Sequence, residues 1–189
     1  MEEWGGNVYT SSDSGVTWIK RQSAGSRSWS YITSSSDGTK LAAAVGGDPN
    51  VGYIYTSPDS GANWFDHQNA GLRNWSSITT SSDGTKLAAV ANKNDGHLYT
   101  STDSGANWSV QVNAGSESWS SITSSSDGNI LAAAASNSYI YTSSDRGVTW
   151  PNIWQTEKGK MDWTSVAMPA NGSFIAAVAA GTTNIFICK

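Results

Sequence analysis

The chain has 189 residues, of which 14% are charged, and its formal net charge is −4 at pH 7. This length is enough for one domain with a sizeable hydrophobic core. The weakly acidic balance argues against a nucleic-acid-binding surface, because such surfaces are basic. The longest apolar runs, such as residues 174–180, are too short to span a bilayer. We therefore expect neither a nucleic-acid partner nor a membrane span.

The cysteine content and the first residues bear on the cellular compartment. Cys188 is the only cysteine, so no disulfide can form within the chain. The start, Met1-Glu-Glu-Trp4, has neither the basic residues nor the apolar stretch of a signal peptide. The chain is therefore either cytosolic, or a processed or recombinant form. Its low charge and Ser/Thr-rich composition suit the second alternative, so we expect an extracellular protein.

Three N-glycosylation sequons begin at Asn74, Asn107 and Asn171. In a chain rich in serine and asparagine some sequons arise by chance. The three asparagines are candidate glycosylation sites only if the protein is secreted.

A ten-residue motif, Tyr-Thr-Ser-x-Asp-x-Gly-x-x-Trp, occurs four times along the chain, and successive copies are 46, 44 and 42 residues apart. A recurring period of this length indicates a repeat architecture. Because the motif recurs with the period of the fold, we interpret its residues as structural. They are the aspartates Asp13, Asp59, Asp103 and Asp145, the glycines Gly15, Gly61, Gly105 and Gly147, and the tryptophans Trp18, Trp64, Trp108 and Trp150.

Each unit of the repeat contains four short segments with strand character. In the first complete unit these are residues 29–33, 41–45, 53–56 and 63–66, and turn signals such as Ser36-Asp-Gly38 separate them. Four short antiparallel strands per repeat predict the blade of a β-propeller. We therefore expect a single all-β domain over residues 1–189, with complete blades at about residues 29–69, 75–113 and 119–155.

The two ends of the chain encode pieces of a further blade. Residues 7–22 supply a third and a fourth strand, and residues 163–188 supply a first, a second and a third. The total is 17 strands, one more than four blades need. We favour a closed four-bladed ring in which the N-terminal strands complete the last blade and so remove sheet edges. In the alternative, the pieces pair between chains, which gives a two-chain ring or a filament.

The segment Ser-x-Asp-x-Gly-x-Thr/Asn-Trp resembles the Asp-box, or BNR repeat. This repeat is found in sialidases, xyloglucan-degrading glycosidases, sortilin-type receptors and a photosystem assembly factor. The resemblance implies a β-propeller with four Asp-box blades, in which each box forms the turn between the third and fourth strands. It does not assign a function, because the family includes enzymes, receptors and assembly factors.

The aspartate of the box has a local physical role. Its carboxylate can accept hydrogen bonds from N–H groups of its own turn, and the glycine tolerates a left-handed conformation. Calcium binding is the alternative, but too few further carboxylates lie nearby for a strong site. A second series, Asp37, Asp83 and Asp127, has the same kind of turn role, and Asn171 replaces it in the last unit. We expect no metal and no cofactor.

The loops between strands two and three and between successive blades vary in sequence and share one face, so ligand-binding residues are expected there. Arg27 and Arg73 occupy equivalent positions in successive units, and Glu117 takes the third. A guanidinium beside a tryptophan suits a sugar or a carboxylate, although a solvated loop charge is the alternative for each residue. The candidate ligand-binding residues are Arg27, Arg73, Glu117, Asp48, Asp95 and His97.

An enzyme of the sialidase type needs an arginine cluster, an activated tyrosine and acidic partners. The chain has four arginines, of which Arg21 and Arg146 lie away from the variable loops. Seven of the fifteen acidic residues belong to turns, which leaves few for a catalytic pair. We therefore expect a non-catalytic binding or scaffolding propeller with a glycan or protein ligand. One alternative is a self-assembling structural subunit, a homo-oligomer joined by exchange of terminal strands. Another is the remnant of a glycosidase propeller.

Overall fold

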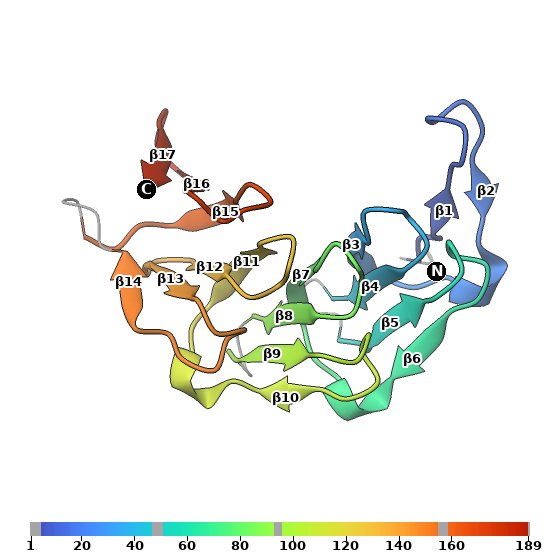
Figure 1. The fold of residues 1–189 in the computed structure, drawn as a ribbon, viewed down its shortest axis with the longest axis horizontal. Coiled ribbons are helices and arrows are strands. Elements are labelled where there is room, and N and C mark those ends of the chain that lie inside the picture. Colours follow the sequence, from blue (N-terminus) through green and yellow to red (C-terminus); the bar gives the residue numbers. More distant parts are fainter. Residues whose placement is uncertain (1–4, 47–50, 93–95, 155–158, 189) are drawn as a thin grey trace.

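The computed structural model describes residues 5–46, 51–92, 96–154 and 159–188. This part of the chain contains 17 β-strands in five antiparallel sheets and three short 3₁₀ helices (Figure 1). The strands begin and end close to the segments rich in β-branched and aromatic residues, which favour a pleated and partly buried surface. The molecule is therefore all-β, as expected.

Three sheets have four strands each, and we call them blades A, B and C. Within each blade the strands are hydrogen-bonded in chain order. Blade A consists of β3 (Trp29–Ser34), β4 (Leu41–Val45), β5 (Ile54–Ser57) and β6 (Phe65–His67). Blade B consists of β7 (Trp75–Thr80), β8 (Leu87–Ala91), β9 (Leu98–Ser101) and β10 (Ser109–Val110). Blade C consists of β11 (Trp119–Ser124), β12 (Leu131–Ala135), β13 (Ile140–Ser143) and β14 (Asn152–Trp154).

The remaining strands form two smaller sheets at the ends of the chain. The N-terminal hairpin pairs β1 (Tyr9–Thr10) with β2 (Ile19–Lys20). Blade D contains three strands, β15 (Trp163–Ala167), β16 (Ile175–Ala179) and β17 (Ile185–Cys188). The 3₁₀ helices, which the sequence analysis did not predict, follow β2, β6 and β10 at η1 (Gln22–Ala24), η2 (Gln68–Ala70) and η3 (Val112–Ala114).

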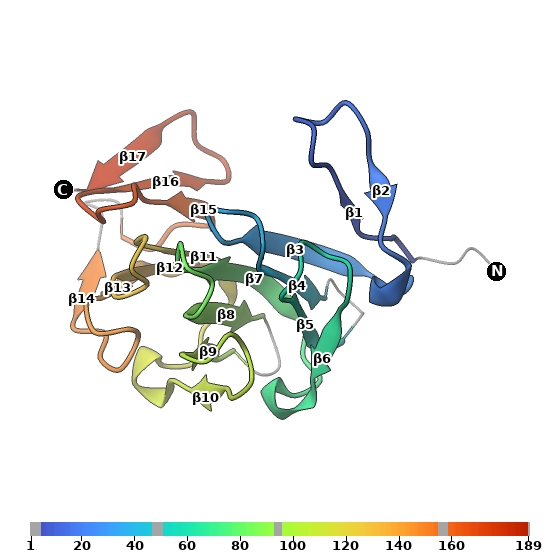
Figure 2. The same ribbon diagram turned by 45° about the vertical axis from the view of Figure 1, so that its right-hand side comes forward.

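The favoured expectation that the N-terminal strands complete the last blade is wrong for this structure. In the described part of the chain β2 pairs with β1, and the sheet of blade D ends at β17. The N-terminal hairpin and blade D lie at opposite ends of an arc of blades (Figures 1 and 2). The physical reason is that each blade packs on the next through the same closely fitted contact. The curvature that this contact sets leaves the two ends apart.

Each inner strand carries a β-bulge directly after its first tryptophan, for example between Trp75 and Ser77 and between Trp119 and Ser121. A bulge re-aims the neighbouring side chain. The indole Nε1 of Trp75 donates to the carbonyl oxygen of Gly52 at 3.0 Å, and that of Trp119 donates to Gly96 at 2.8 Å. Each of these tryptophans therefore ties its blade to the preceding one.

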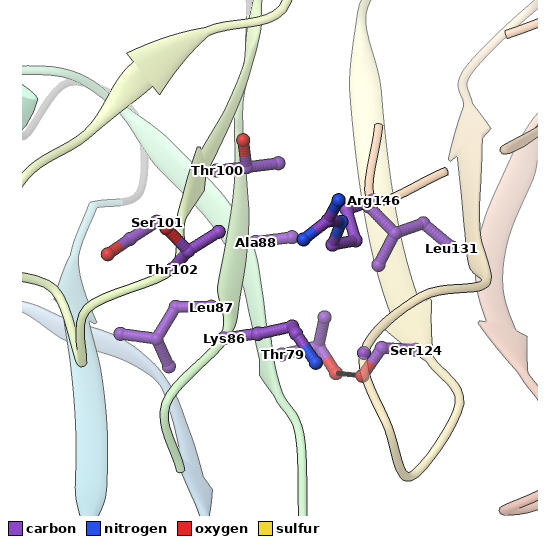
Figure 3. Close-up of a pocket in the computed structure, with 11 residues that line it drawn as sticks. Thr79, Lys86, Leu87, Ala88, Thr100, Ser101, Thr102, Ser124, Leu131 and Arg146 are labelled. Atoms are coloured by element: carbon purple, nitrogen blue, oxygen red, sulfur yellow. Dashed lines mark hydrogen bonds between the residues drawn. The ribbon is translucent and has the colours of Figure 1, made fainter. Parts of the chain in front are cut away.

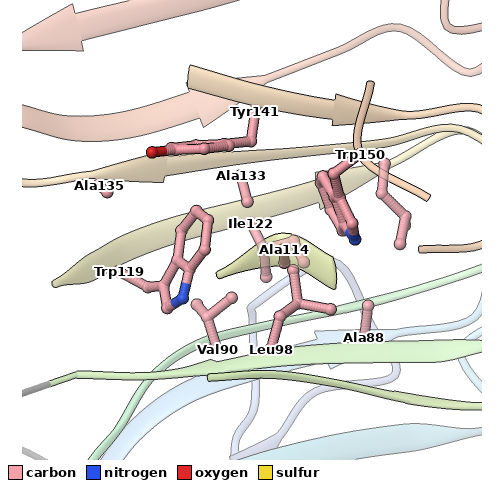
Figure 4. Close-up of a cluster of buried hydrophobic side chains, with 11 residues drawn as sticks. Ala88, Val90, Leu98, Ala114, Trp119, Ile122, Ala133, Ala135, Tyr141 and Trp150 are labelled. Atoms are coloured by element: carbon pink, nitrogen blue, oxygen red, sulfur yellow. The ribbon is translucent and has the colours of Figure 1, made fainter. Parts of the chain in front are cut away.

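The hydrophobic core lies between blades rather than within them. Trp119 and Ile122 of blade C pack against Val90 and Leu98 of blade B, and all four side chains are buried (Figure 4). The middle strand β8 has the sequence Leu-Ala-Ala-Val-Ala and is buried along its whole length. Its small side chains let the neighbouring sheets approach closely, so the blades stack face to face.

A chain of backbone hydrogen bonds also joins the turns between the first and second strands of successive blades. Ser36 N–H donates to the carbonyl oxygen of Ser82 at 2.8 Å, Ser82 to Ser126 at 2.7 Å and Ser126 to Ala170 at 2.7 Å. These bonds repeat with the period of the blades. They hold each blade in the same register relative to its neighbour.

Candidate functional site

The antiparallel strand order gives the molecule two different faces. Turns that join strands one to two and three to four meet at one end, where Ser60 N–H donates to the carbonyl oxygen of Thr39 at 2.7 Å. Loops that join strands two to three and successive blades meet at the other end, where Gly52 and Arg73 form a β-bridge. We call these ends the turn face and the variable-loop face.

On the turn face, the aspartate of the repeated motif is held inside its own turn. In blade B, Asp103 Oδ1 accepts the N–H of Asn107 at 2.8 Å and the hydroxyl of Ser101 at 2.8 Å. Its Oδ2 accepts the side-chain amide of Asn107 at 2.7 Å. The corresponding carboxylates Asp13, Asp59 and Asp145 accept equivalent bonds, with a threonine hydroxyl in place of the asparagine amide at Asp13 and Asp145. Their oxygens are thus occupied by the turn and are poorly placed for a ligand.

The glycine of the motif serves both conformation and packing. Gly105 has φ +91°, a region that favours glycine. A Cβ at this position would lie 3.0 Å from Thr56 Cγ2 and 3.2 Å from His67 Nε2 of blade A. The turn of each blade can therefore approach the preceding blade only with glycine here. Gly15, Gly61 and Gly147 also have positive φ.

Hydrogen bonds hold the carboxyl groups of these turns in the ionised form. The hydroxyl of Thr17, with the N–H of the same residue, lowers the pKa of Asp13 to about 2. Thr149 does the same for the pKa of Asp145, which is also about 2. In the second series, the hydroxyl of Ser35 is the largest cause that lowers the pKa of Asp37 to about 2. Carboxylates with such pKa values do not act as proton donors near neutral pH.

The tryptophans of the motif differ in exposure along the chain. Trp64 and Trp150 are buried, and Trp108 is partly buried. Trp18 in the N-terminal hairpin is 62% exposed. Its Nε1 nevertheless donates to the carbonyl oxygen of Gly15 in its own turn, as the Nε1 groups of Trp64 and Trp150 do in theirs. This difference marks the N-terminal end of the arc as an uncovered sheet face.

On the variable-loop face, Arg27 and Arg73 adopt matching poses in adjacent blades. The guanidinium carbon of Arg27 lies 4.6 Å from the ring centroid of Tyr55, and that of Arg73 lies 4.4 Å from Tyr99. Each tyrosine in turn meets the first tryptophan of its blade edge-on, with centroids 5.1 and 5.3 Å apart. Both arginines are partly exposed. The face therefore presents two cations, each fixed on an aromatic support.

Glu117, at the same position of blade C, is used differently. Its Oε1 accepts the hydroxyl of Tyr141 at 2.5 Å. Burial first, and then this hydrogen bond, raises the pKa of Tyr141 to about 12. In blade D the position belongs to Met161, which packs against the core around Trp163. Arg27, Arg73 and Glu117 thus lie on one face, but only the two arginines share a pose.

The other candidates are placed as follows. His97 lies just before β9, is partly buried, and accepts the N–H of Ala91 through its backbone carbonyl at 3.0 Å. Asp48 and Asp95 lie outside the described residues. In the described part of the chain no three His, Cys, Asp or Glu side chains are grouped so that they could hold a metal ion.

The three sequon asparagines are not equally accessible. Asn107 is exposed, but its side-chain amide donates to Asp103. Asn171 is exposed, and its Oδ1 accepts the N–H of Ser173 at 3.1 Å. Asn74 is partly buried, and its carbonyl oxygen accepts the N–H of Asn92. Asn171 therefore has the side chain best placed for modification.

The turn face has a feature that the sequence analysis missed. Between blades A and B lies a groove of about 230 Å³, lined in part by Phe65, His67 and Leu87. The equivalent gap between blades B and C is only about 10 Å³, because the side chain of Arg146 reaches into it (Figure 3). Serine stands at the corresponding position in the other three motifs. This departure from the repeat was the available signal.

Comparison with known proteins gives a fold and no family. No protein-family model matches the chain, and no curated protein matches its sequence. Among solved structures, YCF48 from Cyanidioschyzon merolae aligns with a TM-score of 0.62 and 16% identity, over 85% of this chain and 52% of that chain. The chain thus spans about half of that protein. At this identity the likeness concerns the fold alone.

Three further solved structures agree. The GH74 xyloglucanase from Xanthomonas campestris aligns with a TM-score of 0.75 and 13% identity, over 97% of this chain and 34% of that chain. A chain of the nidogen/laminin complex aligns with a TM-score of 0.69 and 14% identity, over 90% of this chain and 64% of that chain. The structure of YCF48 bound to a D1 peptide aligns with a TM-score of 0.66 and 17% identity, over 95% of this chain and 56% of that chain. These neighbours are β-propellers, so the β-propeller fold is supported for this chain.

Within the described residues there is no helix of sufficient length and hydrophobicity to cross a bilayer.

Proposed function

We propose that this chain is an Asp-box propeller that binds a ligand without catalysing a reaction, and that the ligand lies on the variable-loop face. The ligand class that suits this face is a glycan or a protein segment that carries carboxylate groups. The observation that carries the proposal is the matched stacking of Arg27 and Arg73 on the tyrosines of adjacent blades.

A stacked guanidinium can still form two parallel hydrogen bonds to a carboxylate through the edge of its plane. Tyr55 and Tyr99 hold the two planes in place before a ligand arrives. Less side-chain freedom is therefore lost on binding than for an arginine that moves freely in solvent. Two such groups in successive blades suit a ligand with repeated negative charges.

Structural neighbours make a protein ligand credible for this fold. One is YCF48 bound to a D1 peptide, and another is a propeller in the nidogen/laminin complex. These partners belong to those proteins. For the present chain they support the general use of a propeller as a binding surface.

The test is a binding screen with immobilised glycans and peptides. The panel contains sialylated and uronic-acid glycans, peptides rich in aspartate and glutamate, and neutral counterparts of each. We expect saturable binding to carboxylate-bearing members. Arg73→Ala should weaken it by about 10- to 100-fold, since a hydrogen bond to a charged group contributes about 1.5–3 kcal/mol.

Arg146→Ser is the matched control for this screen. It removes an arginine from the turn face and restores the serine found at Ser14, Ser60 and Ser104, all of which share its positive φ. Its affinity should equal that of the wild type. The proposal fails if no member of the panel binds, or if Arg146→Ser weakens binding as much as Arg73→Ala.

A second candidate function, that of a self-assembling subunit, is favoured by the uncovered ends of the arc. Ile32 of blade A is 55% exposed, whereas the equivalent Ile78 and Ile122 are 6% and 4% exposed. At the other end Ile185 is 71% exposed, whereas the equivalent Leu98 is fully buried. Both ends thus expose side chains that interior blades bury.

The third candidate is that the chain is the remnant of a glycosidase propeller. The likeness to a GH74 xyloglucanase favours it. Against it, Asp59 and Asp103 accept hydrogen bonds within their own turns, and Glu117 holds the hydroxyl of Tyr141. Few acidic side chains then remain for the pair of carboxyl groups that glycoside hydrolysis uses.

A further inference from the structure

The outer face of blade D repeats the face through which each interior blade binds the next one. In blade B this face consists of Ala88, Val90 and Leu98, which contact the tryptophan and isoleucine of blade C. The equivalent residues of blade D are Ala176, Val178 and Ile185. In blade B the three residues are at most 2% exposed, whereas Val178 is 37% and Ile185 is 71% exposed. Blade D therefore carries a blade-binding face that nothing covers in the described chain.

The other end of the arc carries the complementary feature. Val8 of the N-terminal hairpin is buried against Ala43 and Trp64 of blade A. This places β1 where the third strand of a preceding blade would lie. Among the described residues, no strand occupies the positions of the first and second strands of that blade. A groove of about 200 Å³ remains there, lined by Tyr9, Trp29, Ile32 and their neighbours.

The edge of β1 that faces this groove has no strand beside it in the described part of the chain, since β1 pairs with β2 alone. Such an edge is a template for a further strand. Tyr9 also lacks the support that its equivalents have. It is 48% exposed, whereas Tyr99 meets Trp75 edge-on and is 5% exposed.

We propose that this groove is an acceptor for strands β15 and β16 of a second copy of the chain. The inference rests on the second function proposed above and names its interface. The two copies join head to tail, and the junction reproduces the contact between interior blades. In the acceptor, Ile32 meets Ala176 and Val178 of the donor, as Ile78 meets Ala42 and Ala44 within the chain.

The sheet pairing of blade D fixes the register of the junction. In blade D, Ala177 pairs with Phe186 and Val178 with Ile185. In the acceptor, Tyr9 of β1 and the preceding residue Val8 stand at the positions of Phe186 and Ile185. The strand β1 of the acceptor therefore replaces β17 of the donor beside β16, and Tyr9 takes the place of Phe186 against Trp163.

In the free chain, β17 is then a substitute for the strand that a second copy supplies. Phe186 occupies the position of the repeat tyrosine, with its ring centroid 5.1 Å from that of Trp163. On its other face Ile185 and Ile187 are 71% and 61% exposed. A strand that fits on one side and is apolar and uncovered on the other is suited to displacement.

The test is the mass of purified variants by light scattering behind a sizing column. Wild type should form species of two or more chains. Val178→Arg places a charge on the donor face, and Ile32→Arg places one in the acceptor groove, so each should run as a single chain. Val112→Arg is the matched control, because Val112 is 65% exposed in η3, away from both ends, and should assemble as wild type does.

Mixing the two defective variants gives the sharpest result. Ile32→Arg keeps an intact donor and Val178→Arg keeps an intact acceptor, so the mixture should form a two-chain species that neither forms alone. A mixture that stays at one chain overturns the head-to-tail junction. Circular dichroism of each variant verifies that it is folded.

The outcomes distinguish a failure of the assembly function from a failure of this particular junction. A wild type that stays at one chain at every concentration overturns both the assembly function and this junction. A wild type that assembles, together with Val178→Arg and Ile32→Arg variants that assemble equally well, overturns the junction alone. Deletion of residues 184–189 gives an independent check, because removing β17 should increase assembly, whereas a loss of assembly would contradict its role as a substitute strand.

Discussion

At the scale of single residues, the turn aspartates are saturated acceptors. Asp83 accepts the hydroxyls of Ser81 and Thr85 and the N–H of Thr85 at 2.6–3.0 Å. These bonds, with Ser81 as the largest cause, lower the pKa of Asp83. The pKa values of the other six turn aspartates are lowered for the same reason. The aspartates therefore contribute to the fold through their ionised form.

This predicts a loss of stability in acid. A carboxyl group whose pKa is lower in the folded chain than its unfolded value of 3.8 stabilises the fold above about pH 4. That contribution disappears as the pH falls to about 2, where the folded pKa of Asp37 lies. The thermal midpoint should therefore fall steeply between pH 4 and pH 2. Asp37→Asn should have a lower midpoint than wild type at pH 7 and a shallower fall in acid. An unchanged midpoint down to pH 2 would contradict this reading.

At the scale of elements, stability lies in the contacts between blades. The outer strands are short and exposed, as in β10, whereas β8 and β12 are buried along their whole lengths. A side chain should therefore matter according to whether a neighbouring blade covers it. Its position within its own sheet should matter less.

Equivalent isoleucines allow a direct comparison. Ile122→Ala should lower the free energy of unfolding by about 2–5 kcal/mol, because it leaves a cavity between blades B and C. Ile32→Ala removes the same atoms at an exposed position, so it should change the free energy of unfolding by less than about 0.5 kcal/mol. Both are measured by urea denaturation in the Val178→Arg background, so that assembly does not contribute. Equal losses would mean that the inter-blade cores are not the source of stability.

The positions of the strands could be read from the repeat, because the turn residues and the β-branched segments recur with it. The contacts that each side chain makes could not be read from the repeat. Arg27 and Glu117 occupy equivalent sequence positions, yet one stacks on a tyrosine and the other accepts a tyrosine hydroxyl. Whether the ends meet was also not predictable, because the angle between blades depends on packing that strand patterns do not encode. The Arg146 that fills one inter-blade gap was visible as a departure from the repeat.

At the scale of the whole molecule, the described blades form an open arc. Its variable-loop face carries the two stacked arginines, and its ends carry a blade-binding face and the groove that would receive it. Open sheet edges and apolar faces are rarely left uncovered in a stable molecule. An arc of this kind is therefore expected to complete itself with another blade of the same type.

The most direct test of this account is the solution mass of the wild-type chain, measured by light scattering over a range of concentrations. We expect masses that are multiples of the chain mass of 19.9 kDa and that rise with concentration. A single species at 19.9 kDa under all conditions is the result that a closed four-bladed ring would give. That result would contradict the assembly of open arcs.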